Sequence, residues 1–209
     1  LFQEWLTTDE AHTTTRSFEF TQLVPFPKQE VIIETTLLGN NGQQQAILRH
    51  KLSPDDKLIR HLDNRDAVPH EYLLKSGSSE ECIDIVIMAE GYTQEEMNIF
   101  MQDARTACDE IMRYEPFASH RDKFNVIAVK CPSIQSDVSV PQDGTWKQTA
   151  INSNFMTFYS PRYLTSNSVH LIHDNLIGVP YEHLIILANT DTYGGGGIYN
   201  SYTLTTAHH

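Results

Sequence analysis

Three short apolar segments in the second half of the chain constrain the fold more than any other feature. They lie at residues 82–92, 124–131 and 183–190 and have the sequences CIDIVIMAEGY, FNVIAVKC and HLIILANT. Such runs are typical of strands that are covered on both faces of a sheet. Helical patterns separate them. The order β-α-β-α-β therefore predicts an α/β domain with a mainly parallel sheet and helices on its faces.

The first of the two helices should begin at Thr93. Thr93 and Glu96 match the T-x-x-E capping box, and Pro116 provides a stop. A second helix is expected over residues 167–177, with Gly178 as its C-cap. The apolar residues of the first helix recur at helical spacing, which predicts one buried face: Met97, Phe100, Met101, Ala104, Cys108, Ile111 and Met112.

The first part of the chain has a β pattern instead. TTTRSFEFTQLVPF alternates, QEVIIETTLLG is rich in Val, Ile and Thr, and Asn41-Gly42 suits a hairpin turn before QQQAILRH. We interpret residues 1–62 as part of an antiparallel β-sandwich. Residues 63–81 are interpreted as a linker with at most a short strand near Tyr72–Leu74, and residues 82–209 as the α/β domain.

Composition excludes several classes of partner. The formal net charge is −12 without any basic run, which argues against nucleic acid or an anionic membrane surface. No apolar stretch is long enough to span a membrane. The wide spacing of Cys82, Cys108 and Cys131 favours buried free thiols over a disulfide framework or a cysteine zinc site.

Ligands of open α/β sheets gather beyond the carboxyl ends of the strands. Those ends carry AEGYT with Glu90, KCPS at residues 130–133, and NTDTYGGGG with Asp191. Glu90 and Asp191 are acidic candidates for a cleft there. The competing interpretation is that both residues only solvate the ends of strands.

The glycine run Gly194–Gly197 does not match a phosphate-binding motif. A P-loop requires a following G-K-[ST], and the dinucleotide fingerprint requires a glycine where Tyr199 stands. A mobile rim, or the close approach of another backbone, remains as its role.

Histidines do not form a zinc motif in this chain. His170 and His173 lack both the i, i+4 spacing and the glutamate of H-E-x-x-H, which favours an ordinary helix flank. His208 and His209 are compatible with a tag, a loop or a site rim. No G-x-S-x-G is present.

Several blocks together resemble the IgA peptidase family of secreted zinc metallopeptidases. These blocks span residues 82–209 and are DIVIMAEGYTQEEMNIFMQDA, EPFASHRDKFNVIAVKCPS, VSVPQDGTW, TFYSPRYLT and YEHLIILANTDTYGGGGIYNSYTLTTAHH. The first part of the chain is similar to the β-sandwich domain that precedes the peptidase domain in family members. The resemblance implies a zincin-like α/β domain and a zinc-dependent endopeptidase that acts on protein substrates outside the cytoplasm.

The resemblance also implies where the chemistry lies. In the family, the position of TAHH is followed by an H-E-F-G-H-type helix, whose histidines bind zinc and whose glutamate activates the zinc-bound water. We therefore expect the catalytic HExxH just after His209, and no catalytic or metal residue within this chain, which should be inactive as written. His208 and His209 would lead into that helix. IYNSYTLTT is expected to be an edge strand for an extended substrate, with a cleft rim formed by Gly194, Gly195, Gly196, Gly197, Ile198 and Tyr199.

Two other functions stay open. The first is a non-catalytic extracellular module, built on a degenerate peptidase domain, that binds protein or glycan through aromatic residues of the long loop. These residues could equally be core: Trp146, Phe155, Phe158 and Tyr159. The second, a nucleotide-binding protein, is weaker because the glycine fingerprints fail and the charge is acidic.

Overall fold

The computed structural model describes residues 13, 24, 27–39, 41–59, 61, 67–198 and 202–208 of the chain. Contacts between residues divide the chain into two units, of which Gln22–Asp63 forms the smaller. None of the described helices is long and apolar enough to cross a membrane.

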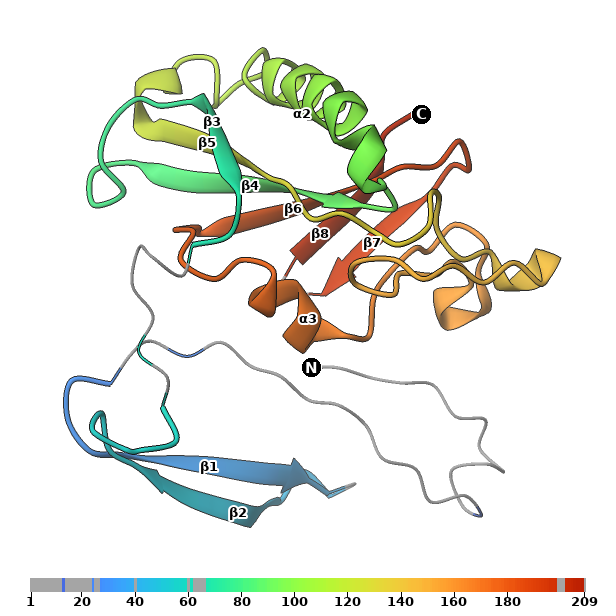
Figure 1. Cartoon of the computed structure of the whole chain (residues 1–209). Coiled ribbons are helices and arrows are strands. Elements are labelled where there is room, and N and C mark those ends of the chain that lie inside the picture. Colours follow the sequence, from blue (N-terminus) through green and yellow to red (C-terminus); the bar gives the residue numbers. More distant parts are fainter. Residues whose placement is uncertain are drawn as a thin grey trace. The chain divides into compact units, whose positions relative to one another are not determined.

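The smaller unit contains a β-hairpin, drawn in blue in Figure 1. β1 (Val31–Leu38) pairs antiparallel with β2 (Gln44–Leu52), and the register shifts between Thr35 and Thr36. Gly42 in the turn has a φ of 76°, a conformation that favours glycine, so the predicted turn is confirmed. Apart from residues 13 and 24, the strand predicted over residues 13–26 lies outside the described residues.

The larger unit is built on a six-stranded mixed sheet with the order β3-β5-β4-β6-β8-β7. The inner pairings β5–β4, β4–β6 and β6–β8 are parallel, whereas β3–β5 and β7–β8 are antiparallel. In chain order the strands are β3 His70–Leu74, β4 Ile83–Glu90, β5 Phe124–Val129, β6 His183–Ala188, β7 Gly195–Ile198 and β8 Tyr202–Thr206.

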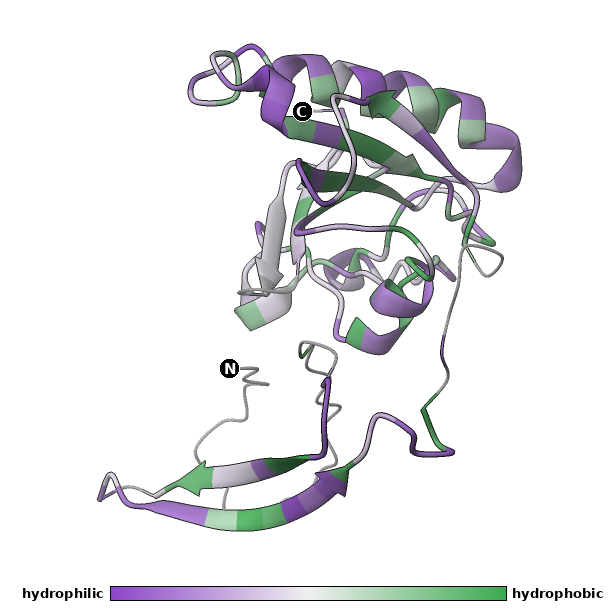
Figure 2. Ribbon diagram, turned by 90° about the vertical axis from the view of Figure 1, so that its left-hand side faces the viewer, coloured by the Kyte–Doolittle hydropathy of each residue, from purple (hydrophilic) through white to green (hydrophobic). Residues whose placement is uncertain are grey.

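Helices cover both faces of this sheet, with α2 on one face and α3 on the other (Figure 1). All three predicted buried strands are present, and the residues of β4 from Asp84 onward and the whole of β5 are buried. Figure 2 shows these central strands as the most apolar part of the unit, while α2 turns polar residues to the outside. The core therefore lies where the apolar runs predicted it.

The two helices differ from their predictions at their ends. α2 (Met97–Ile111) follows a 3-10 turn, η2 (Gln94–Glu96), and ends before Pro116. The capping box is present, since the Thr93 N–H donates to the Glu96 carboxylate at 2.8 Å. α3 (Val169–Asp174) is shorter than expected because the Leu176 N–H bonds to the His173 carbonyl, in the tighter pattern typical of helix ends. The remaining 3-10 turns are η3 Arg121–Lys123, η4 Pro141–Asp143 and η5 Thr157–Tyr159.

The two edges of the sheet are β3 and β7. The short strand expected near Tyr72–Leu74 is β3. The expectation that IYNSYTLTT forms a single edge strand is wrong, because β8 lies inside the sheet between β6 and β7. Alternate residues of β8 are buried, namely Tyr202, Leu204 and Thr206, because they share the covered face of the sheet. The glycine run itself, as β7, forms the edge.

Candidate functional site

Glu90, the last residue of β4, anchors the long loop of residues 132–165. It is completely buried, at 0% exposure. Its carboxylate accepts hydrogen bonds from the Ser153 hydroxyl at 2.5 Å, the Ser153 N–H at 3.1 Å and the Ile151 N–H at 3.2 Å. Burial raises the pKa of Glu90, and these hydrogen bonds offset that rise only in part. Glu90 is therefore neither a cleft acid nor a solvating strand end.

A chain of hydrogen bonds joins the start of α2 to the end of β8. The Ser136 hydroxyl donates to the Glu96 carboxylate at 2.8 Å and accepts from Asn189 Nδ2 at 3.2 Å. Asn189 Nδ2 also donates to the Gly91 carbonyl at 3.0 Å, and Asn189 Oδ1 lies 3.1 Å from Nε2 of His208. The residues that leave β8 are thereby held against the carboxyl ends of β4 and β6.

The glycine run packs backbone against backbone. A Cβ at Gly197 would lie 2.4 Å from the Tyr202 carbonyl oxygen, and one at Gly196 would lie 2.8 Å from the Leu164 carbonyl oxygen. A Cβ at Gly194 would lie 2.5 Å from the buried ring of Phe155. No side chain fits at these distances, so the alternative in which glycine permits close backbone approach describes this segment.

On the outer side of β7, the backbone of Gly195 is covered by residues 162–164, whereas the backbone of Gly197 is not. The Gly195 N–H donates to the Arg162 carbonyl at 3.0 Å, and the Gly195 carbonyl accepts from the Leu164 N–H at 3.2 Å. The covering segment then leaves β7, because Thr165 exchanges hydrogen bonds with Asn154 instead.

Backbone groups alternate between the two sides of a strand, so the N–H and C=O of Gly197 face the same side as those of Gly195. Gly197 is exposed. Within the described ranges, neither of its backbone groups has a hydrogen-bond partner on that side. Among the described residues, Gly197 is thus an open hydrogen-bonding position at the edge of the sheet.

The predicted cleft rim lies along this edge. Gly194 precedes β7 and the other three glycines belong to it. Only the backbone of Ile198 is described, and Tyr199 lies outside the described residues. A role of these residues in binding substrate stays a prediction.

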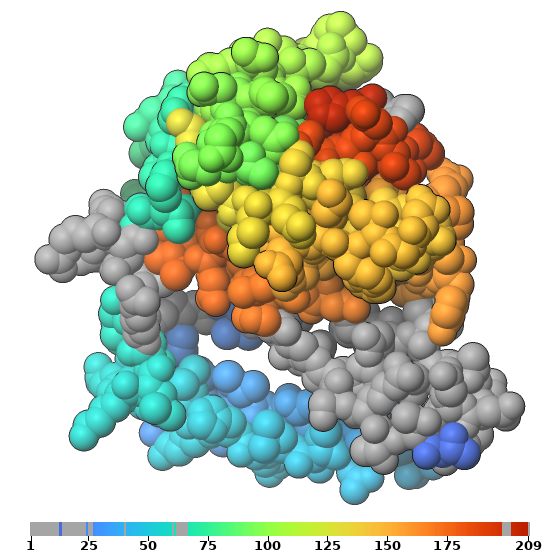
Figure 3. Space-filling view, turned by 45° about the vertical axis from the view of Figure 1, so that its right-hand side comes forward, coloured from blue at the N-terminus to red at the C-terminus, as the bar shows by residue number. Residues whose placement is uncertain are grey.

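The four aromatic residues proposed for a binding module do not share one environment. Phe155 is core, at 0% exposure, which corrects its place in that set. Trp146, Phe158 and Tyr159 are exposed. The space-filling view in Figure 3 shows the long loop, in yellow and orange, next to the red surface of the last strands.

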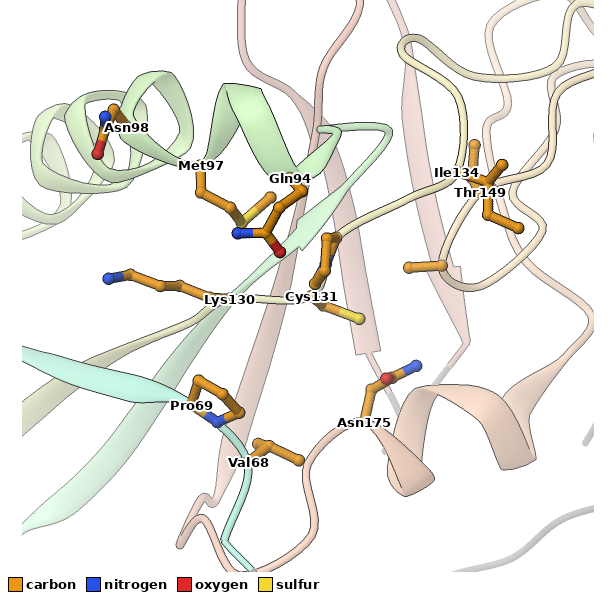
Figure 4. A pocket seen from close by; sticks show the side chains of 12 residues that line it. Val68, Pro69, Gln94, Met97, Asn98, Lys130, Cys131, Ile134, Thr149 and Asn175 are labelled. Carbon is orange, nitrogen blue, oxygen red and sulfur yellow. The ribbon is translucent and has the colours of Figure 1, made fainter.

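A cavity of about 800 Å³ lies at the carboxyl end of β5 (Figure 4). β4, β6 and β8 separate β5 from β7 in the sheet, so this cavity is distinct from the open edge. Burial raises the pKa of the Cys131 thiol to about 12, which keeps it protonated and a poor nucleophile. The cavity has mixed polar and apolar walls: Val68, Pro69, Gln94, Met97, Asn98, Lys130, Cys131, Pro132, Ile134, Thr149, Ala150 and Asn175.

His173, the second histidine of the H-x-x-H pair, packs against Tyr181. His173 Nδ1 lies 2.7 Å from the Tyr181 hydroxyl, and the two rings stack. Burial lowers the pKa of His173. The three cysteines are free; Cys108 and Cys131 are buried, as expected, whereas Cys82 is only partly buried.

Sequence reasoning missed the structural roles of Glu90, Ser136 and Asn189. Their partners lie far away along the chain, so no local pattern could reveal them. The only local signal was their place relative to the strands: Glu90 is the last residue of β4, and Asn189 directly follows β6.

Comparison with known families then gives the class of the protein: two family models match the chain, and both describe peptidases. The model of the IgA Peptidase M64 family matches residues 72–208, and that of the Peptidase M64 N-terminus matches residues 1–49. The chain therefore belongs to the IgA peptidase M64 family, which is a family of metallopeptidases. A search of curated proteins found no match.

Family membership implies a metal ion and a protein substrate. Among the described residues, no group of three or more His, Cys, Asp or Glu side chains could hold a metal ion. The described residues thus do not by themselves form a metal centre.

Proposed function

We propose that this chain forms the scaffold and the substrate-binding edge of a secreted, zinc-dependent endopeptidase. The observation that carries the proposal is the open N–H and C=O of Gly197 on the outer side of β7, in a chain of a peptidase family. An extended peptide satisfies such groups by adding a strand to the sheet.

Glycine makes this edge suited to a main-chain partner. Gly195–Gly197 carry no side chains, so nothing on them obstructs an incoming backbone. Recognition through backbone groups does not depend on sequence, and an endopeptidase needs this property to hold a variety of extended segments.

The metal ligands and the general base are proposed to come from an HExxH helix in the sequence that follows His209 in the family. The hydrogen bond between His208 and Asn189 supports this arrangement, because it fixes the residues that would lead into such a helix. The larger unit would then be zincin-like, the hairpin unit would be part of a β-sandwich, and the protein would act outside the cytoplasm.

The first experiment uses the gene product that contains this chain together with the sequence following it. We expect about one zinc per molecule by elemental analysis, as in metallopeptidases with a catalytic zinc, and hydrolysis of casein that a chelator abolishes. Casein hydrolysis that survives complete metal removal would overturn the zinc assignment.

A second experiment tests the edge on the present chain. Amide exchange at Gly197, measured by NMR, should slow when reduced and carboxymethylated α-lactalbumin, an unfolded protein, is added. The Gly195 amide, already bonded to Arg162, serves as the internal reference. Unchanged exchange at Gly197 under saturating conditions would exclude pairing at this edge.

The alternative is a non-catalytic module that binds protein or glycan. The exposure of Trp146, Phe158 and Tyr159 favours it. Metal-independent binding of a glycan, together with no hydrolysis by the metal-loaded gene product, would support this alternative over the peptidase.

A further inference from the structure

Exposed aromatic rings gather beside the open edge of β7. We call the group of Phe158, Tyr159, Tyr163 and Tyr193 the aromatic surface. Their exposures are 49%, 69%, 46% and 61%. Aromatic side chains are enriched where proteins bind partners, since they supply a large contact area at a low cost in entropy.

Contacts of Phe158, Tyr163 and Tyr193 place the aromatic surface beside β7, and Tyr159 directly follows Phe158 in the chain. The rings of Phe158 and Tyr163 meet edge to face, with centroids 5.8 Å apart. The backbone of Tyr163 forms a bridge with Gly195, two residues before the open Gly197. The Arg162 guanidinium lies over the Tyr193 ring, 5.7 Å from its centroid, and Tyr193 directly precedes the glycine run. The aromatic surface therefore adjoins the proposed binding edge.

The backbone that presents two of the rings is unusual. Met156, Phe158 and Tyr159 have φ values of 67°, 56° and 58°. Large side chains rarely adopt this left-handed conformation, which costs roughly 1–2 kcal/mol per residue. Burial of the two rings does not offset that cost, because Phe158 and Tyr159 remain exposed. Backbone strain of this kind clusters at ligand-binding segments.

Hydrogen bonds hold the strained segment in place. The Thr157 N–H donates to the Tyr163 carbonyl at 3.3 Å, and the hydroxyls of Thr157 and Thr165 lie 2.7 Å apart. Asn154 and Thr165 exchange backbone hydrogen bonds at its base. The rings are thus displayed on a fixed support, which lowers the entropy lost on binding.

Charge narrows the choice of ligand. Residues 156–163 have the sequence MTFYSPRY, in which Arg162 is the only charged residue. No carboxylate in this segment would pair with a basic side chain, and the guanidinium would repel it. The segment thus disfavours a basic group, while its exposed rings offer contact area to an apolar one.

We propose that the aromatic surface binds a large apolar or aromatic side chain of the peptide whose main chain pairs with Gly197. This inference rests on the proposed function, because the peptide main chain at β7 brings its side chains beside the rings. The preference for particular peptide side chains at β7 would then come from the neighbouring aromatic surface.

The test uses short threonine peptides in which one position carries Phe, Leu, Ala or Lys, and the position is moved along the peptide. Affinity for the present chain is measured by fluorescence anisotropy, and pairing is measured by amide exchange at Gly197. At the best position we expect Phe and Leu peptides to bind about tenfold more tightly than Ala or Lys peptides.

Phe158→Ala and Tyr159→Ala should each reduce this preference while leaving Gly197 protected by the Ala peptide. Tyr159 is the second variant because its ring is the most exposed of the four. The matched control is Tyr114→Ala. Tyr114 resembles Tyr193 of the aromatic surface, because it is 61% exposed and has an arginine, Arg113, over its ring. It follows the end of α2 that lies far from β7 (Figure 1).

The outcomes separate the two proposals. Equal affinity of Phe and Ala peptides that both protect Gly197 would overturn the aromatic assignment and leave the edge proposal intact. A preference for Phe that both variants retain, or that Tyr114→Ala removes, would also overturn it. Peptides that neither bind nor protect Gly197 would overturn both.

Discussion

Nε2 of His208 lies 3.1 Å from Oδ1 of Asn189, and this contact defines which ring nitrogen carries the proton. Asn189 turns its amide nitrogen to the Gly91 carbonyl and the Ser136 hydroxyl, so its oxygen must face His208. An oxygen accepts only from a protonated nitrogen, and the neutral imidazole must therefore hold its hydrogen on Nε2.

This arrangement predicts the tautomer of His208. In the neutral ring the Nε2–H form should be almost fully populated, and Asn189→Leu should shift it toward the mixture found in a free imidazole. Long-range nitrogen–proton NMR of the neutral ring measures both states. A dominant Nδ1–H form in the unmodified chain would contradict the hydrogen bond.

Because Glu90 is buried, we expect the free energy of unfolding to fall as pH rises. Burial raises its pKa above the ordinary 4.5, so the folded chain retains a proton that the unfolded chain has released. The free energy of unfolding should decrease from about pH 4.5 up to the raised pKa, with a slope of up to about 1.4 kcal/mol per pH unit.

Glu90→Gln should remove this decrease, since the amide does not titrate and its oxygen still accepts from Ser153. Urea unfolding of both proteins across the pH range isolates the contribution of Glu90 as the difference between the curves. Parallel curves would show that Glu90 ionises without a penalty.

For Glu96 we expect the opposite: its contribution to the free energy of unfolding should fall as pH falls. Burial raises the pKa of its carboxyl, but hydrogen bonds from the Thr93 N–H and the Ser136 hydroxyl outweigh this and lower it below 4.5. The stability that Glu96 contributes is therefore fully present above pH 4.5 and is lost as pH falls through the lowered pKa.

Glu96→Gln keeps a side-chain oxygen for the cap but removes the negative charge that its hydrogen bonds stabilise, so it should cost up to about 1 kcal/mol near neutral pH and nothing in strong acid. Glu95→Gln is the control, because Glu95 is an exposed neighbour in the same turn and should change stability by less than about 0.5 kcal/mol. Equal effects of both substitutions would show that charge near the helix start, and not the cap, is responsible.

A side chain at Gly196 should lower the free energy of unfolding because it would crowd its neighbours. An added Cβ would lie 2.8 Å from both the Leu164 carbonyl oxygen and Cγ2 of Thr165. Gly196→Ala should destabilise the chain by about 1–3 kcal/mol, as overpacking does, and should speed amide exchange in β8.

Gly144→Ala is the control for Gly196→Ala. Nothing lies within 4 Å of its added Cβ, but its φ of 70° imposes strain. It should lower global stability without a selective effect on β8. Unchanged exchange in β8 after Gly196→Ala would mean that β7 can move away without loss of pairing.

The sequence predicts well the parts of the fold that depend on local patterns. The strands at Ile83–Glu90 and Phe124–Val129 follow from uninterrupted apolar runs, and the start of α2 follows from its capping box. The turn at Gly42 follows from its need for positive φ. Each of these signals is contained within a few neighbouring residues.

The rest depends on partners that are distant along the chain. β8 became an interior strand because β7 pairs with its other side, and Phe155 became core because it packs beneath Gly194. Glu90 acquired its role from Ser153, which belongs to a separate loop. The apolar or polar character of a residue does not encode such pairings, so periodicity could not reveal them.

The glycine run has a consequence for how this protein can change over time. Neighbouring atoms leave no room for a Cβ at Gly194, Gly196 or Gly197, so the proposed edge can persist only while these positions stay glycine. The neighbouring segment of residues 156–163 has no such restriction on its exposed rings. Mutation can therefore alter what is preferred at the edge without altering how the edge holds a chain, and relatives could diverge in preference while sharing one invariant strand.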